Sequence, residues 1–328
     1  MKNLIYYPNF ESSDLNWLKF ALLYIDNFSP IIPDTGIDFL SELYKKLQSE
    51  TDLLNLQRLG VGAGMRATNK AIDYVTKVLE NPHSFADELH SPNIVRNWMN
   101  KEQQTYTLFD EKYVSNWKWF CQQNGLAKDS KYGIDISKSL GEVYMTFLAQ
   151  EEAYEKEASP ITDNRYLDNL SMTIRSKDVA NDNKIEVAKS IIQYNLPLDF
   201  SKISIDKVIE IRNKPDFKVK QSTFQSELDK IYDKIGKGIS PNEFSDSYKK
   251  NFADWSGELT EYGIETVACG LSAYILLENA NATNLEYIKE ALEVGLVICA
   301  GKNIVKNINN NHERKYCRQY LTELQSIK

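Results

Sequence analysis

The pattern of apolar and polar positions is clearest in the first 32 residues of the chain. Residues 4–7 form a short apolar run that ends at a proline, and this pattern predicts a β-strand. Residues 15–25 are apolar almost all round, which predicts a helix buried on most of its faces. Residues 28–32 predict a second strand, which Pro30 favours at the edge of a sheet. Together these segments predict a β-α-β unit, with a right-handed crossover if the two strands are parallel.

Helical periodicity continues along the rest of the chain. Ser12, Ser13 and Asp14 precede the first helix and suit its N-cap position. The spacing of apolar residues predicts further helices over 38–48, 65–79, 112–123, 140–148, 204–212 and 217–235. Extended segments are predicted over 105–109, 132–136 and part of 185–198. The two most apolar segments, 264–277 and 285–300, contain several small residues, so we predict that they form a buried helical pair.

These elements predict a helix-rich α/β fold, with a small N-terminal domain that contains the β-α-β unit and a helical C-terminal bundle. We place a mixed α/β domain at 1–160, a connecting segment with an extended piece and helices at 161–238, and a helical domain at 239–328. The length of 328 residues suits such an organisation.

Composition and charge limit the class of protein and the cellular compartment that the sequence suits. Hydrophobic residues make up 42% of the chain, which is ample for a buried core, and the formal net charge of −7 disfavours a large nucleic-acid footprint. The four cysteines form no C-x-x-C pair, which fits a reducing compartment. The N-terminal residues lack the pattern of a signal peptide, and the longest uncharged apolar stretch is well short of the roughly 20 residues that cross a membrane. We therefore predict a cytoplasmic protein with no membrane span.

The first 33 residues carry the most distinctive motifs. They are Leu4-Ile5-Tyr6-Tyr7-Pro8, Trp17-Leu18-Lys19, Ala21-Leu22-Leu23-Tyr24-x-Asp26 and Ile31-x-Pro33. In these motifs the chain resembles a bacterial family known only as a domain of unknown function, and residues 106–148 and 198–224 resemble it in places. The shared positions concern packing. The resemblance implies a cytoplasmic protein of bacterial or phage origin, and it supplies no catalytic residue.

A glycine-rich stretch precedes the helix predicted over 65–79. The free N–H groups of a helix N-terminus bind phosphate, so Gly62, Gly64 and Arg66 form a candidate phosphate site. The dinucleotide-binding fingerprint requires G-x-G-x-x-G directly after a strand. Here the third glycine comes one position early and the preceding residues look helical, which favours the alternative of a flexible hinge.

The triplet Asp34-Thr35-Gly36 matches the motif of aspartic proteases. Such enzymes need two aspartates that share a proton, and they place the triplet after a strand in a β-rich domain. Here the triplet follows a proline and is surrounded by predicted helices. We interpret it as a turn and a helix cap.

Metal and cofactor sites have little support in the sequence. The chain has three histidines, and His83 and His90, with Asp87 between them, make too thin a ligand set. No His-Glu-x-x-His pattern and no P-loop occur. We predict neither a metal nor a cofactor, and we assign no residue a catalytic role.

Sheet geometry indicates one place for a site. Ligands of open parallel sheets bind beyond the carboxyl ends of the strands. If the strands over 4–7 and 28–32 are parallel, their ends bring Tyr7, Asp34 and Thr35 to one edge. We hypothesise that this edge binds a small ligand or a partner.

The leading functional interpretation is a non-enzymatic protein-binding component of a bacterial or phage system, with a role in host–phage conflict, whose partner is another protein or a second copy of the chain. The alternative is an enzyme that processes nucleotides or nucleic acid. That alternative relies on the N-terminal α/β unit or on the basic residues near the C-terminus, the only place for a local nucleic-acid contact. These basic residues are Lys302, Lys306, Arg314, Lys315 and Arg318.

Overall fold

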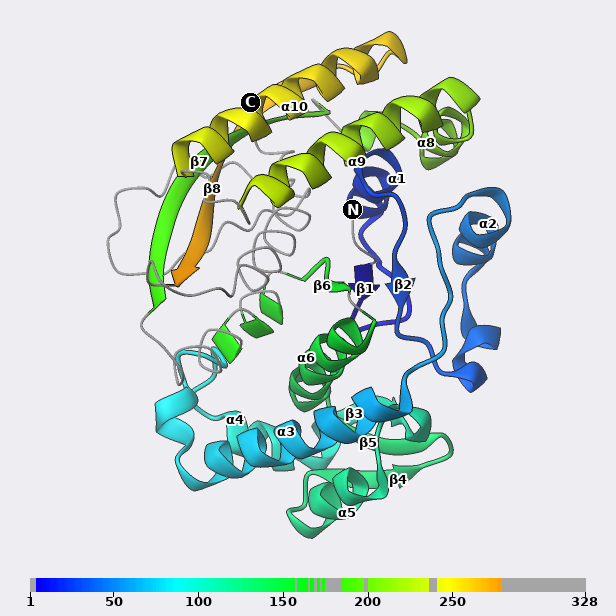
Figure 1. Cartoon of the computed structure of the whole chain (residues 1–328). Coiled ribbons are helices and arrows are strands. Elements are labelled where there is room, and N and C mark those ends of the chain that lie inside the picture. The colour runs from blue at the N-terminus through cyan, green and yellow to red at the C-terminus, as the bar shows by residue number, and fades with distance from the viewer. Residues whose placement is uncertain are drawn as a thin grey trace.

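The computed structural model describes residues 4–156, 158–164, 166–167, 170–171, 173–174, 185–197, 200–235 and 241–278. Helices dominate these ranges, and the strands form two small three-stranded sheets and one two-stranded ribbon (Figure 1). The predicted helix-rich α/β class is therefore confirmed. The predicted domain boundaries stay a prediction.

A parallel sheet of very short strands lies near the centre of the molecule (Figure 1). Its middle strand is β1 (Leu4–Tyr6), with β2 (Ser29–Pro30) on one side and β6 (Ser159–Ile161) on the other. Both neighbours run parallel to β1. The two predicted strands are confirmed, although the second is only two residues long, and they adopt the parallel arrangement that the sequence left open. The sequence did not indicate β6, because three residues that include a proline show no strand periodicity.

Successive residues of β1 point to opposite faces of the sheet, and both faces are buried. Leu4 and Tyr6 belong to one apolar core, whereas Ile5 and Tyr7 belong to a second core on the other face. All four are at most 1% exposed. A strand covered on both faces must be apolar at every position, which explains the uninterrupted apolar run at the start of the chain.

The helix α1 (Leu15–Tyr24) is buried as its sequence predicts. The Asp14 carboxylate accepts the backbone N–H groups of Asn16, at 2.8 Å, and Trp17, at 3.1 Å, and so satisfies two donors of the first turn. Every residue from Trp17 to Tyr24 is buried. Lys19 Nζ donates to the carbonyl of Phe200 at 2.7 Å, so even this charged side chain is accommodated inside the fold.

The C-terminal end of α1 is satisfied from a distant helix. Arg212, the last residue of α8 (Ile205–Arg212), is fully buried. Its guanidinium donates to the carbonyls of Leu22 at 2.7 Å and Ile25 at 2.9 Å. The last carbonyls of a helix have no partner within the helix. Arg212 therefore allows α1 to end inside a core.

Further side chains complete this contact. The carboxylate of Asp52 pairs with Arg212 at 2.8 Å; partial burial raises the pKa of Asp52, but Arg212 and Lys218 lower it by more. Two glutamines of α9 (Pro215–Ile235), Gln221 and Gln225, also donate to carbonyls at the end of α1. Side chains of α8 and α9 therefore hydrogen-bond the end of α1 inside the first apolar core, and these bonds join the N-terminal α/β unit to the later helices.

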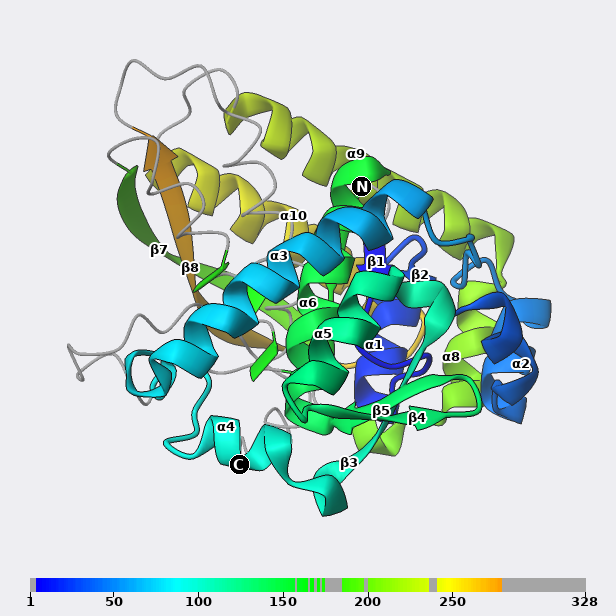
Figure 2. The same ribbon diagram turned by 90° about the horizontal axis from the view of Figure 1, so that it is seen from below.

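The second core lies on the other face of the parallel sheet. It is built by α3 (Val61–Glu80), α5 (Ser115–Gln123) and α6 (Lys138–Glu155), and by an antiparallel sheet of β3 (Gln104–Phe109), β5 (Gly133–Ser137) and β4 (Ala127–Ser130). Every residue of α6 from Leu140 to Ala153 is buried. In the view from below, α3, α5 and α6 lie in front of β1 (Figure 2). The helix predicted over 140–148 and the strands predicted over 105–109 and 132–136 are confirmed.

Shorter helices connect these layers. They are α2 (Glu42–Glu50), α4 (Ile94–Met99) and the 3-10 helices η1 (Asp34–Phe39), η2 (Pro82–Phe85), η3 (Lys101–Gln103), η4 (Asp110–Lys112) and η5 (Phe200–Lys202). The helix predicted over 38–48 starts only at Glu42, because the Ser41 hydroxyl caps it by accepting the N–H of Tyr44 at 3.3 Å.

The helix predicted over 264–277 is wrong. This segment is β8 (Thr266–Glu278), which pairs antiparallel with β7 (Ile185–Pro197) along its whole length. The preceding helix α10 (Pro241–Glu261) stops at Gly263, which has φ +77° and donates to the Thr260 carbonyl while Ile264 donates to that of Leu259. The chain leaves this cap in an extended direction. The segment 285–300, predicted as the second helix of the pair, lies outside the described residues.

We expect the substitution Arg212→Met to destabilise the fold strongly. It removes the short hydrogen bonds to the buried carbonyls of Leu22 and Ile25, which then keep only the longer ones from Gln221 at 3.4 Å and 3.3 Å. Losing one partner of such a buried charged contact costs roughly 3–5 kcal/mol. Denaturant unfolding followed by circular dichroism measures the effect. The control is Lys207→Met, which removes a half-exposed cation from the same helix. Equal stability of the two variants would contradict the assignment.

Candidate functional site

The predicted edge of the parallel sheet holds Tyr7, Asp34 and Thr35, but the three do not face the same way. The Tyr7 side chain is 1% exposed, and its hydroxyl donates to the Leu167 carbonyl at 3.2 Å within the second core. Asp34 and Thr35 are exposed at the start of η1. Tyr7 therefore contributes to packing, and η1 carries the surface-accessible part of this edge.

A glutamate from another part of the chain holds the start of η1. The Glu111 carboxylate accepts the backbone N–H groups of Asp34 at 2.6 Å and Thr35 at 3.2 Å, and the Thr35 hydroxyl at 2.6 Å. Slight burial raises the pKa of Glu111, but these hydrogen bonds lower it by more. The contact fixes η1 against the end of β3, since Glu111 lies in η4 directly after that strand.

The glycine of the Asp34-Thr35-Gly36 triplet has a packing role. A Cβ atom at Gly36 would lie 2.8 Å from a ring carbon of Phe10. Only glycine lets the Phe10 ring approach η1 this closely. Together with the Glu111 contact, this geometry gives the triplet a structural role. The triplet forms the first turn of η1, and the predicted helix cap is wrong, because Pro33 occupies the N-cap position and no side chain caps η1.

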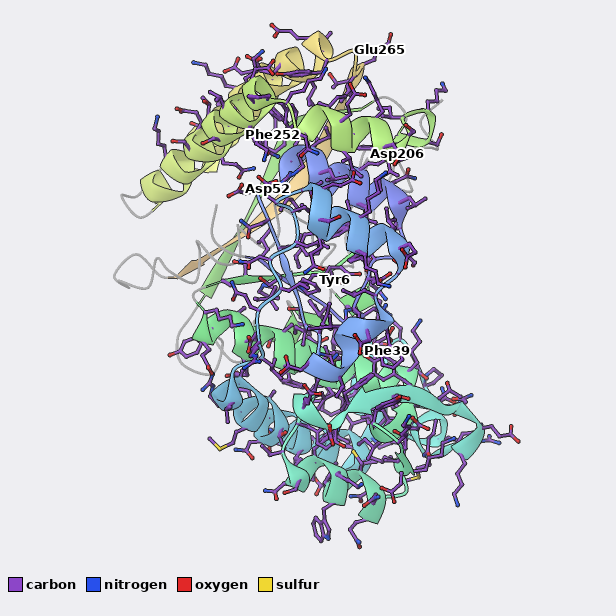
Figure 3. The ribbon with its side chains drawn as sticks, turned by 90° about the vertical axis from the view of Figure 1, so that its right-hand side faces the viewer. Tyr6, Phe39, Asp52, Asp206, Phe252 and Glu265 are labelled. Atoms are coloured by element: carbon purple, nitrogen blue, oxygen red, sulfur yellow. The ribbon has the colours of Figure 1, made fainter. Side chains whose placement is uncertain are left out.

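Four aromatic side chains meet beside η1, and we call them the aromatic surface: Phe10, Phe39, Phe109 and Tyr132. The ring centroids are 5.3 Å apart for Phe10 and Phe109, 5.7 Å for Phe39 and Tyr132, and 5.6 Å for Phe109 and Tyr132. Phe39 is 57% exposed, and the other three are half-buried. Figure 3 shows Phe39 on η1, at the outside of the molecule and away from Tyr6 in the interior.

Sequence reasoning missed this surface because its members are far apart in the chain. Phe10 follows β1, Phe39 ends η1, Phe109 ends β3, and Tyr132 lies in the turn between β4 and β5. That turn depends on Gly133, at φ +153°, where a Cβ atom would lie 2.2 Å from the Leu108 carbonyl oxygen. Gly133 was the one local signal of a tight turn, and it does not reveal which rings the turn brings together.

Charged residues adjoin the aromatic surface. Asp38 and Asp110 are exposed next to Phe39 and Phe109 in the chain. Lys131 Nζ lies 4.9 Å from the centroid of the Tyr132 ring, and Lys112 Nζ lies 4.7 Å from that of Phe10. Two of the four rings therefore have a lysine Nζ near their centroid, and for the exposed Lys131 this is the geometry of a cation–π contact.

Lys112 differs from Lys131 because it is buried. It is 2% exposed, and its Nζ has the Met145 sulfur as a hydrogen-bond partner at 3.8 Å. Burial lowers the pKa of Lys112 to about 7, although the neighbouring Glu111 raises it slightly. The fold therefore holds an amine that is partly neutral near neutral pH.

We expect Lys112 to make stability depend on pH. The unfolded chain binds this proton more tightly than the folded chain, so folding releases the proton above pH 7, and the free-energy cost of that release falls as the pH rises from 7 towards 10. The difference in unfolding free energy between the wild type and Lys112→Met should shift in favour of the wild type by about 2 kcal/mol between pH 7 and 9. Urea unfolding at both pH values measures it. A pH-independent difference would show that the buried amine keeps its ordinary pKa.

A second polar network closes the edge next to β6. Ser12 Oγ donates to the Asp163 carboxylate at 2.5 Å, and the Ser12 N–H donates to the Tyr44 hydroxyl at 2.6 Å. Burial raises the pKa of Asp163, while the hydrogen bond from Ser12 lowers it by less. The network joins the loops after β1 and β6 to α2, and we assign it to packing.

The candidate phosphate site at the start of α3 is filled by carboxylates of α6. The Gly60 N–H donates to Glu152 at 2.9 Å, and Arg66 bonds Glu151 and Glu155, each at 2.8 Å. A Cβ atom at Gly62 would lie 2.7 Å from the Glu155 carboxylate, and one at Gly64 would lie 3.6 Å from the Lys112 carbonyl. Gly62 therefore admits the Glu155 side chain of α6, whereas the space beside Gly64 would accommodate a Cβ atom. The three carboxylates already pair with Arg66, Lys70 and Lys156, so an incoming phosphate would have to displace them.

Lys302, Lys306, Arg314, Lys315 and Arg318 lie outside the described residues. His90 contacts the Tyr166 ring, with centroids 5.5 Å apart. Within the described ranges, no three His, Cys, Asp or Glu side chains are grouped as a metal site.

Comparison with known proteins adds no relative: no family model, no curated protein and no solved structure matches the chain. The family resemblance of the N-terminal motifs therefore stays a prediction. Among the helices of the described ranges, none combines the length and the apolar character needed to cross a membrane.

Proposed function

We propose that this protein is a non-enzymatic, cytoplasmic protein-binding component, and that the aromatic surface is where its partner binds. The observation that carries the proposal is Phe39, a large apolar side chain that is 57% exposed within a group of four rings. Aromatic residues are enriched in the buried centres of protein interfaces and supply most of their binding energy. The bacterial or phage setting, including host–phage conflict, follows from the motif resemblance and from the kind of system in which families without known function occur.

The way η1 is held supports a binding role. A binding residue works best when its support is ordered before the partner arrives, because ordering then costs no binding energy. Glu111 fixes η1 through three hydrogen bonds to Asp34 and Thr35, and Gly36 admits the Phe10 ring beneath it. Phe39 therefore lies on a short helix whose position is fixed by hydrogen bonds and packing.

The alternative of a nucleotide- or nucleic-acid-processing enzyme has weaker support. The glycine-rich stretch meets Glu152 and Glu155 of the same chain. The basic residues near the C-terminus lie outside the described residues. Salt-sensitive binding of DNA or RNA, or a thermal shift that depends on a divalent metal, would favour the enzyme.

We expect Phe39→Ala to abolish partner binding without unfolding the protein. Chemical cross-linking and affinity purification from the source organism, read by quantitative mass spectrometry, should show a stoichiometric partner with the wild type and at least a roughly tenfold loss with the variant. The matched control is Trp119→Ala, which removes another exposed aromatic residue, on α5, at 66% exposure.

Thermal unfolding should differ little between the two variants and the wild type, because substitutions at exposed positions usually change stability by less than about 0.5 kcal/mol. Retention of every partner by Phe39→Ala, or equal loss in Trp119→Ala, would contradict the proposal.

A further inference from the structure

We propose that the aromatic surface recognises a cationic segment of its partner protein, with an arginine or lysine side chain placed over the Phe39 ring. This inference rests on the proposed function and adds the chemistry of the partner. It starts from the contacts that the rings already make within the chain.

One ring of the aromatic surface already contacts a cation within the chain. The exposed Lys131 lies over Tyr132, with an Nζ to centroid distance of 4.9 Å, and the buried amine of Lys112 lies 4.7 Å from the centroid of Phe10. The negative face of an aromatic ring attracts such groups, and arginine uses this contact more often than lysine. Phe39 is the most exposed ring of the same group, so it presents this chemistry to an incoming molecule.

Carboxylates lie near Phe39 in the chain and at the start of its helix. Asp38 precedes Phe39 in the chain, and Glu111 bonds the start of the same short helix. Asp110, the first residue of η4, is also exposed. These carboxylates attract a cation that approaches the ring, while Lys131 and Arg58, which pairs with Asp34 at 3.5 Å, offset part of the field.

The residues near Phe39 favour a protein partner over a nucleic acid. Exposed aromatic rings also stack nucleic-acid bases, but such sites follow the phosphate backbone with a positive groove. Asp38, Asp110 and Glu111 would repel phosphates next to Phe39. Ile37, 41% exposed on the same helix, offers an apolar contact for the aliphatic stem of an arginine or lysine.

Peptide binding to the full chain tests the inference. Fluorescence anisotropy compares three labelled twelve-residue peptides, built from Arg, Leu and Ser, from Glu, Leu and Ser, and from Leu and Ser alone, with a single-stranded DNA oligonucleotide. We expect the arginine peptide to bind roughly 3- to 30-fold more tightly than the neutral peptide, and the glutamate peptide and the DNA to bind more weakly still.

Four variants locate the effect. Phe39→Ala and the double variant Asp38→Lys with Asp110→Lys should each remove the preference for the arginine peptide, whereas Phe39→Tyr should keep it. The matched control, Asp73→Lys with Asp254→Lys, makes the same charge change at exposed acids on α3 and α10 and should leave the preference intact. Equal binding of the arginine and neutral peptides, or a preference for DNA, overturns the inference.

The outcomes distinguish the two proposals. If the natural partner is lost with Phe39→Ala but kept by the double charge-reversal variant, protein binding stands and the cationic partner is wrong. If Phe39→Ala keeps the natural partner, the proposed function itself fails, whatever the peptides show.

Discussion

The buried guanidinium of Arg212 at the end of α1 is the contact on which the rest of the structure depends. A helix that is apolar almost all round can be buried only if its terminal carbonyls also find donors. Arg212, Gln221 and Gln225 provide them from helices that come much later in the chain. The central strand β1 packs between α1 and α6, so the position of the parallel sheet follows from this contact.

Because that sheet is small, packing against the flanking layers largely determines its position. Two of its strands have three residues and one has two, so few backbone hydrogen bonds hold it together. Its position is instead fixed by the alternation of Leu4, Ile5, Tyr6 and Tyr7 between two apolar cores. The loops at its carboxyl edge are then held by side chains, through Glu111 at η1 and through Ser12 and Asp163 between β1 and β6.

Sequence reasoning was accurate where periodicity is strong and local. The strand at Leu4–Tyr6, the helix at Leu15–Tyr24 and the helix around Leu140 follow from runs of apolar residues that only burial explains. It failed at β8, because a mostly apolar run without internal charges has the same pattern in a strand and in a helix. Gly263, which ends the preceding helix, is the local signal that favours the strand. The aromatic surface could not be predicted, since residues 10, 39, 109 and 132 become neighbours only through tertiary contacts.

The distance along the chain between α1 and its cap has a consequence for synthesis. Arg212 follows Leu22 by 190 residues, and a ribosome that adds 5–20 residues per second takes roughly 10–40 s to make that stretch. The first strand must also wait for β6 before its second edge is paired. Until then, the apolar helix α1 has left the ribosome while the later helices that bury it have not yet been made. The nascent chain is therefore a natural client for chaperones that bind exposed apolar segments.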